Sequence, residues 1–192
     1  MIRISPSIAS CNLLKIGDEI KSIENEYDDL HIDIEDGNFT PNITFGMKMV
    51  KQIRQITNMP FSVHLMVTNP EEYLTELYTL GCQTIFIHAE STMYLKRYLY
   101  EIRNHGIFAG IALNPGSNAK NYDYLIDDFD ALMYMTSEVD GDGEKFQNRV
   151  LDKIIQIKDK EIWLDGGINK VNIRQLPSFV DVVVMGRAIF NN

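Results

Sequence analysis

Short apolar stretches rich in β-branched residues recur along the whole chain. Stretches of this length and composition, ended by turn-forming residues, predict β-strands. We place the predicted strands at residues 2–5, 30–34, 61–66, 84–88, 108–113, 131–135, 161–164 and 181–185.

Segments with helical periodicity separate most of these stretches. Ile16, Ile20 and Ile23, for example, share one face of a predicted helix. Strand alternating with helix indicates βαβ units and a parallel sheet. Eight strands without a linker favour a single (β/α)8 barrel domain over residues 1–192, rather than an open doubly wound sheet. The predicted helices cover residues 14–26, 47–56, 72–80, 95–103, 119–126, 150–157 and 171–176.

The last predicted strand is followed by very few residues. Only Arg187 to Asn192 come after the glycine that ends it, where a complete barrel would add a closing helix. We therefore expect the last helix to be truncated and to leave apolar surface next to the first and last strands. Such surface is usually covered by a partner, which predicts a homo-oligomer.

Composition removes several classes of function. The formal net charge is −9 with no basic cluster, which argues against binding to nucleic acid. No apolar run is long enough to cross a membrane, and no signal peptide is expected. The two cysteines form no CxxC pair, so we expect reduced thiols and a cytoplasmic protein.

Polar residues interrupt three of the predicted strands near their carboxyl ends. His31 and Asp33 lie two apart and so share one face of their strand, while His64 lies in the strand at 61–66 and Asp165 directly follows the one at 161–164. The carboxyl ends of barrel strands are where α/β barrels carry their chemistry. Two histidines and two aspartates meeting there predict a metal site with two carboxylates.

Such a site suits proton transfer next to a carbonyl group. Removing a proton alpha to a ketone leaves an enediolate, whose charge a divalent metal stabilises as a Lewis acid. Two carboxylates on opposite faces let one take the proton and the other return it, which inverts the carbon. The ligand set is compatible with Zn²⁺, Fe²⁺, Mn²⁺ or Co²⁺, and we take zinc as the first expectation.

Six motifs, in this order along the chain, carry a resemblance to a known family. The chain resembles the ribulose-phosphate 3-epimerase family, including its allulose-6-phosphate 3-epimerase relatives. The resemblance implies a (β/α)8 barrel, one divalent metal ion and 3-epimerisation of a phosphorylated ketose. The motifs are ISPSIAS, HIDIEDGNFTPNITFG, HLMVTNPEEY, GIALNP, WLDGGI and VVMGRAIF.

The resemblance also implies a role for individual residues. His31, Asp33, His64 and Asp165 match the family's metal ligands, and Asp33 and Asp165 match its acid–base pair. The remaining matches are substrate contacts: Ser7 in the first strand, the methionines Met66 and Met135 that line the reacting atoms, and the phosphate-binding glycines Gly166, Gly167 and Gly186.

The chain departs from the family pattern in three places. Glu35 replaces a methionine on the face that carries His31 and Asp33. Residues 136–146, with three acidic side chains at 140, 142 and 144 and another at Glu138, replace a glycine-rich loop. Arg187 replaces a small residue and offers a guanidinium to a phosphate. We therefore expect Glu35 to influence specificity and the substrate to differ from plain ribulose 5-phosphate.

Two alternative functions stay open at this point. One is a diverged epimerase for another ketose phosphate, and the other is a non-catalytic barrel subunit that kept the metal site. An orotidine-phosphate decarboxylase is disfavoured, because no lysine lies near Asp33. We interpret His88 and His105 as structural or exposed residues.

Overall fold

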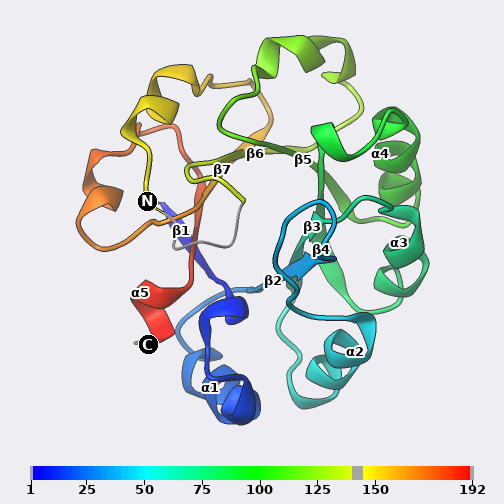
Figure 1. The fold of residues 1–192 in the computed structure, drawn as a ribbon, viewed down its shortest axis with the longest axis vertical. Coiled ribbons are helices and arrows are strands. Elements are labelled where there is room, and N and C mark those ends of the chain that lie inside the picture. Colours follow the sequence, from blue (N-terminus) through cyan, green and yellow to red (C-terminus); the bar gives the residue numbers. More distant parts are fainter. Residues whose placement is uncertain (1, 140–144, 191–192) are drawn as a thin grey trace.

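The computed structural model describes residues 2–139 and 145–190, and these form a barrel of parallel strands (Figure 1). All eight predicted strands are present, and each begins and ends within two residues of its expected bounds. They are β1 (Arg3–Pro6), β2 (Leu30–Glu35), β3 (Phe61–Met66), β4 (Cys82–His88), β5 (Phe108–Leu113), β6 (Ala131–Met135), β7 (Glu161–Asp165) and β8 (Val182–Met185). The (β/α)8 fold predicted from the alternating pattern is confirmed.

The strands pair in one sheet of order β1-β8-β7-β6-β5-β4-β3-β2. β1 pairs with β8 over its whole length, from Arg3 opposite Val182 to Pro6 opposite Met185. β1 and β2 pair over a shorter length, since the bridge described between them is an isolated one that joins Ser7 to His31. The barrel is therefore nearly closed, and the short pairing that completes it, between β1 and β2, lies at His31.

Helices surround the barrel on the outside (Figure 1). The first four long connections form α-helices, whereas the connections after β5, β6 and β7 form 3-10 helices. Residues such as Asn121 and Asp123 favour the α-helix weakly, which agrees with the tighter turns there. The α-helices are α1 (Ile16–Ile23), α2 (Met47–Ile56), α3 (Glu71–Leu77), α4 (Leu95–Asn104) and α5 (Arg187–Phe190); the 3-10 helices are η1 (Ile8–Ser10), η2 (Leu13–Lys15), η3 (Ala89–Ser91), η4 (Ala119–Leu125), η5 (Asn148–Lys153) and η6 (Asn172–Gln175). The last helix, α5, is short, as expected.

Alternating side chains divide the core into two layers. One set of strand residues packs outward against the helices, and a smaller cluster fills the barrel interior. Gly110 makes room for this filling, because a Cβ atom there would lie 2.2 Å from the Phe86 ring. The interior cluster contains Phe86, Ala112, Ala131, Met133, Met135, Trp163, Val182 and Val184.

Two further expectations from composition can be compared with the structure. In the part of the chain that it describes, no helix combines the length and apolar character needed to cross a membrane. Cys11 and Cys82 are both free and buried. Burial raises the pKa of these thiols to about 11 and about 12, so neither is an activated nucleophile.

Candidate metal centre and substrate pocket

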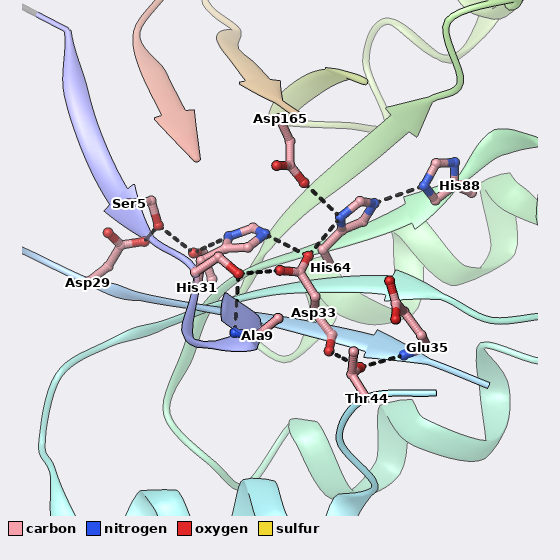
Figure 2. A network of polar contacts seen from close by, with 12 residues as sticks. Ser5, Ala9, Asp29, His31, Asp33, Glu35, Thr44, His64, His88 and Asp165 are labelled. Carbon is pink, nitrogen blue, oxygen red and sulfur yellow. Dashed lines mark hydrogen bonds and ion pairs between the residues drawn. The ribbon is translucent and has the colours of Figure 1, made fainter. Parts of the chain in front are cut away.

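The four residues predicted to bind a metal meet at the carboxyl end of the barrel. His31 and Asp33 project from the same face of β2, and parallel register places Asp33 opposite His64 of β3. Asp165 ends β7 and reaches the same point from another side (Figure 2). One donor atom from each residue can be chosen so that all four atoms lie within 4.8 Å of one another.

The donor atoms converge without forming a closed set of hydrogen bonds. Nδ1 of His64 lies 3.2 Å from Oδ1 of Asp33 and 3.3 Å from Oδ2 of Asp165. Nε2 of His31 lies 3.4 Å from Oδ1 of Asp33, yet this buried nitrogen makes no hydrogen bond in the described structure. An orphaned imidazole nitrogen beside two carboxylates suits a divalent transition metal, so the residues fit the expected group.

Electrostatics at the centre also favour a cation. Burial alone would raise the pKa of Asp33, but the positive charge of the nearby His31 and the hydrogen bond to His64 hold it well below its usual range. Burial lowers the pKa of His64, but hydrogen bonds to Asp165 and Asp33 outweigh it and raise that pKa to about 9. The Asp33 carboxylate is thus ionised and already attracts positive charge.

Asp33 is fixed at both its side chain and its backbone. Ser7 donates a hydrogen bond from Oγ to Oδ2 of Asp33 at 2.5 Å, and Thr44 donates one to the Asp33 carbonyl oxygen. The Thr44 hydroxyl also accepts from the backbone N–H of Glu35. The hydroxyl proton of Ser7, which we predicted as a substrate contact, is therefore already used in the hydrogen bond to Asp33.

Sequence reasoning missed several polar residues behind the two histidines. His88 is buried and has its Nε2 atom 2.8 Å from Nε2 of His64 (Figure 2). It closes β4, and this position at a strand end is the signal that could have drawn attention to it. Ser62 similarly lies 2.8 Å from Nδ1 of His31. His105, by contrast, is exposed at the end of α4, as we interpreted it.

A cavity of about 460 Å³ opens directly above the two aspartates. The structure brings most of the predicted substrate residues to its wall. These are Ser7, Glu35, Met66, Met135, Gly167, Gly186 and Arg187, together with Asp33 and Asp165. Ser137, which sequence reasoning passed over, lines it too, and its buried hydroxyl has no hydrogen-bond partner in the described residues.

Gly166 does not line the cavity, but it packs against Ser137, which does. Its φ of +113° suits only glycine, and an added Cβ would lie 2.7 Å from the backbone nitrogen of Ser137. Gly167 follows with a φ of +64°. The two glycines therefore let the loop after β7 pass against the end of β6.

The segment after β6 is held at both of its ends. The backbone N–H of Gln147 donates to the carbonyl of Thr136 at 2.7 Å, and the Thr136 hydroxyl donates to the carbonyl oxygens of Asp165 and Gly166. Of the acidic residues predicted in this segment, Glu138 lies at the cavity wall. Positions 140–144 lie outside the described residues.

Glu35 lies at the cavity wall on the same strand as the two ligands from β2. Its Oε2 atom accepts a hydrogen bond from Nδ2 of Asn42 at 2.7 Å. The side chain is partly buried. The chain thus places a third carboxylate beside the space that a substrate would enter.

Comparison with known proteins agrees with this geometry. The model of the ribulose-phosphate 3 epimerase family matches residues 3–190. Ribulose-phosphate 3-epimerase of Bacillus subtilis is 34% identical, with 99% of this chain and 93% of the relative covered. The chloroplastic ribulose-5-phosphate-3-epimerase of Arabidopsis thaliana is 32% identical, with 98% and 72% covered.

Solved structures add a likeness in fold alone. A mutant tryptophan synthase alpha-subunit from Pyrococcus furiosus superposes with a TM-score of 0.72, covering 100% of this chain and 91% of that chain, at 13% sequence identity. The barrel is therefore shared widely, whereas the sequence match is specific. This chain belongs to the ribulose-phosphate 3-epimerase family and is an epimerase, an enzyme of the isomerase class.

Proposed function

We propose that this chain is a metal-dependent 3-epimerase of a ketose phosphate that works by deprotonation and reprotonation. The observation that carries the proposal is a cluster of two aspartates and two histidines whose two carboxylates line one cavity. Its relatives are named for ribulose phosphate, which makes ribulose 5-phosphate the first substrate to test.

The acid–base step falls to Asp33 and Asp165. They come from β2 and β7, which are not neighbours in the sheet, so their carboxylates approach the cavity from different sides. One carboxylate takes the proton from carbon 3, and the other returns a proton to the opposite face. His31 and His64 would hold the divalent metal together with them. That metal supplies Lewis-acid stabilisation of the negative charge on the substrate.

The other cavity residues position the substrate. Met66 and Met135, both buried, present apolar thioether groups that keep water from the reacting carbon. Gly167 and Gly186 line the cavity and leave backbone groups there for the phosphate, while Gly166, the third glycine of the expected phosphate site, holds the loop after β7 in place. Arg187, which lies at the cavity wall, adds a guanidinium suited to the same phosphate.

A second candidate substrate class is favoured by one observation, the carboxylate of Glu35 at the cavity wall. A carboxylate held by Asn42 accepts hydrogen bonds from sugar hydroxyls, which the family's methionine does not. A ketose phosphate with an additional hydroxyl group, such as allulose 6-phosphate, would then be preferred over ribulose 5-phosphate.

Solvent deuterium exchange at carbon 3, followed by NMR in D₂O, tests the proposal. Ribulose 5-phosphate, allulose 6-phosphate and other ketose phosphates would be compared for the wild type and for the Glu35→Met and Arg187→Ala variants. We expect exchange with at least one of them and a higher KM in Arg187→Ala. A kcat/KM for ribulose 5-phosphate above about 10⁵ M⁻¹s⁻¹ would refute the altered preference.

Two outcomes would contradict the broader proposal. A metal-loaded protein that exchanges no proton of any ketose phosphate would indicate the non-catalytic alternative. Unchanged kinetics in Glu35→Met would remove the assignment of specificity to that carboxylate.

A further inference from the structure

Each histidine of the candidate metal centre turns one ring nitrogen toward the carboxylates and the other away from them. The inner atoms are Nε2 of His31 and Nδ1 of His64. An imidazole binds a metal through a nitrogen that carries no proton, and the partner of its other nitrogen decides where the proton resides. The groups behind the two rings therefore matter for the centre.

The outer nitrogen of His31 begins a chain of hydrogen bonds that ends on Asp29. The Asp29 carboxylate accepts from Ser5 Oγ at 2.6 Å, so Ser5 has used its proton. Ser62 Oγ lies 3.0 Å from Ser5 Oγ and must therefore donate to it. Ser62 is then left to accept from Nδ1 of His31 at 2.8 Å. This series of hydrogen bonds fixes a proton on Nδ1 of His31 and leaves Nε2 of His31 available to bind a metal.

The outer nitrogen of His64 begins a second chain, which ends on Glu90. Nδ1 of His88 lies 3.1 Å from Oε2 of Glu90, and a carboxylate only accepts, so His88 carries its proton there. Its Nε2 atom is then an acceptor for Nε2–H of His64 at 2.8 Å. The other oxygen of Glu90 is held by the backbone N–H of Asn114 and the hydroxyl of Ser117.

Both chains are shielded where they touch the rings. Ser5, Ser62 and His88 are all buried, so water does not replace them as partners. The two chains leave the centre in different directions, one toward Ser5 and Asp29 and the other toward His88 (Figure 2). They share no residue with each other and reach separate carboxylates.

We propose that Ser62, Ser5 and Asp29 on one side, and His88 and Glu90 on the other, are positioning residues for the two metal-binding histidines. They keep a proton on the outer nitrogen of each ring, so that the inner nitrogen is the one that gives up any proton it carries and binds a divalent metal. This inference rests on the metal site proposed above. It adds that the site depends on two hydrogen-bonded chains extending beyond its four ligands.

Matched substitutions separate this role from general stability. Ser62→Ala and His88→Leu each remove one acceptor, and loss of such a partner lowers metal affinity by about 10–100-fold. His88→Gln keeps an acceptor oxygen and should restore much of the affinity. Thr84→Val is the control, because Thr84 is buried, pairs with Ser62 in the register of β3 and β4, and belongs to neither series of hydrogen bonds.

Two measurements on the full chain test the proposal, one of them without metal. Zinc affinity is obtained by competition with a chelator for the wild type and each variant. In metal-free protein labelled with ¹⁵N-histidine, the wild type should show a ¹⁵N–¹⁵N coupling across the His64–His88 hydrogen bond. The chain has four histidines, and the exposed His105 can be replaced by alanine to simplify assignment.

The outcomes distinguish the proposed role of the positioning residues from the metal site itself. We expect the coupling in the wild type, its loss in His88→Leu, and weaker zinc binding in His88→Leu and Ser62→Ala but not in Thr84→Val. Absence of the coupling in the wild type would overturn the proposed role of His88, even if the variants did not fold. Folded His88→Leu and Ser62→Ala proteins with unchanged zinc affinity would overturn it as well. A wild type that binds no zinc, iron, manganese or cobalt would instead overturn the proposed metal site.

Discussion

The hydroxyl of Ser7 donates to the Oδ2 atom of Asp33 at 2.5 Å, which leaves Oδ1 of the same carboxylate facing both histidines. Replacing Ser7 by alanine should free the carboxylate to rotate and lower kcat by about 10–100-fold, the usual effect of losing a partner of a metal ligand. Steady-state kinetics checks this, with Ser22→Ala on the surface of α1 as control. An unchanged kcat with a raised KM would mean that Ser7 contacts substrate only.

We expect one divalent metal per chain, held by His31, Asp33, His64 and Asp165. Elemental analysis of protein purified without chelator should give a near-stoichiometric content. The His64→Ala, Asp165→Ala double variant should lose it, because two of the four converging donors are gone. His105→Ala serves as control. A double variant with wild-type metal content would place the metal elsewhere.

Asp165→Asn should abolish proton exchange even where metal is retained. The amide keeps an oxygen for the metal but does not accept a proton as a base, and general acid–base catalysis contributes about 10²–10⁴-fold. Exchange rates must be divided by metal content, since Asp165 serves both purposes in our proposal. Near-normal exchange in the metal-loaded variant would contradict the two-carboxylate mechanism.

Gly166→Ala should destabilise the protein by about 1–3 kcal/mol, the usual cost of a strained backbone conformation. A methyl group there meets the Ser137 backbone, and the backbone carries a φ that alanine rarely adopts. Denaturant unfolding measures the change. Gly116→Ala is the matched control, because an added Cβ at Gly116 has nothing within 4 Å. Equal stability of the two variants would show that the loop relaxes freely.

Asp36 links the turns after β2 and β3 and should make stability depend on acid pH. Burial would raise its pKa, but hydrogen bonds from Thr68, Phe39 and Asn38 outweigh this and lower it to about 2. A lowered native pKa means that this stabilisation is present above about pH 4 and is lost as pH falls toward 2.

Thermal unfolding across this range compares the wild type with Asp36→Asn. The wild type should be the more stable at pH 5, and the difference should shrink toward pH 2. Asp152→Asn, at an exposed position of η5, is the control. A difference independent of pH would show that the charge of Asp36 is not what holds the two turns.

The barrel and the positions of the four candidate metal ligands were accessible from the sequence because both depend on local patterns. Residues two apart, such as His31 and Asp33, share a face of any strand. The 3-10 character of η4 to η6 was not accessible, since segments this short do not separate a period of 3.0 from one of 3.6. The expected homo-oligomer and cytoplasmic location stay predictions.

The hydrogen-bonded chains behind the ligands lay beyond local pattern for a different reason. Ser5 and Ser62 meet only because the barrel brings β1 and β3 together, across 57 positions of sequence. His88 looked like an ordinary core histidine, since a single histidine at a strand end fits several roles. Such partners become visible only when strand register fixes which side chains face one another.

The hydrogen bond between Thr136 and Gln147 has a consequence for how this protein can diversify. Because Gln147 is hydrogen-bonded to Thr136 at the end of β6, the two ends of the segment between them lie side by side. Insertions, deletions and new charges can accumulate there while the strands that bear Asp33 and Asp165 keep their alignment. Exchanging residues 137–146 between relatives should therefore change the chain beside the cavity without shifting β2 and β7.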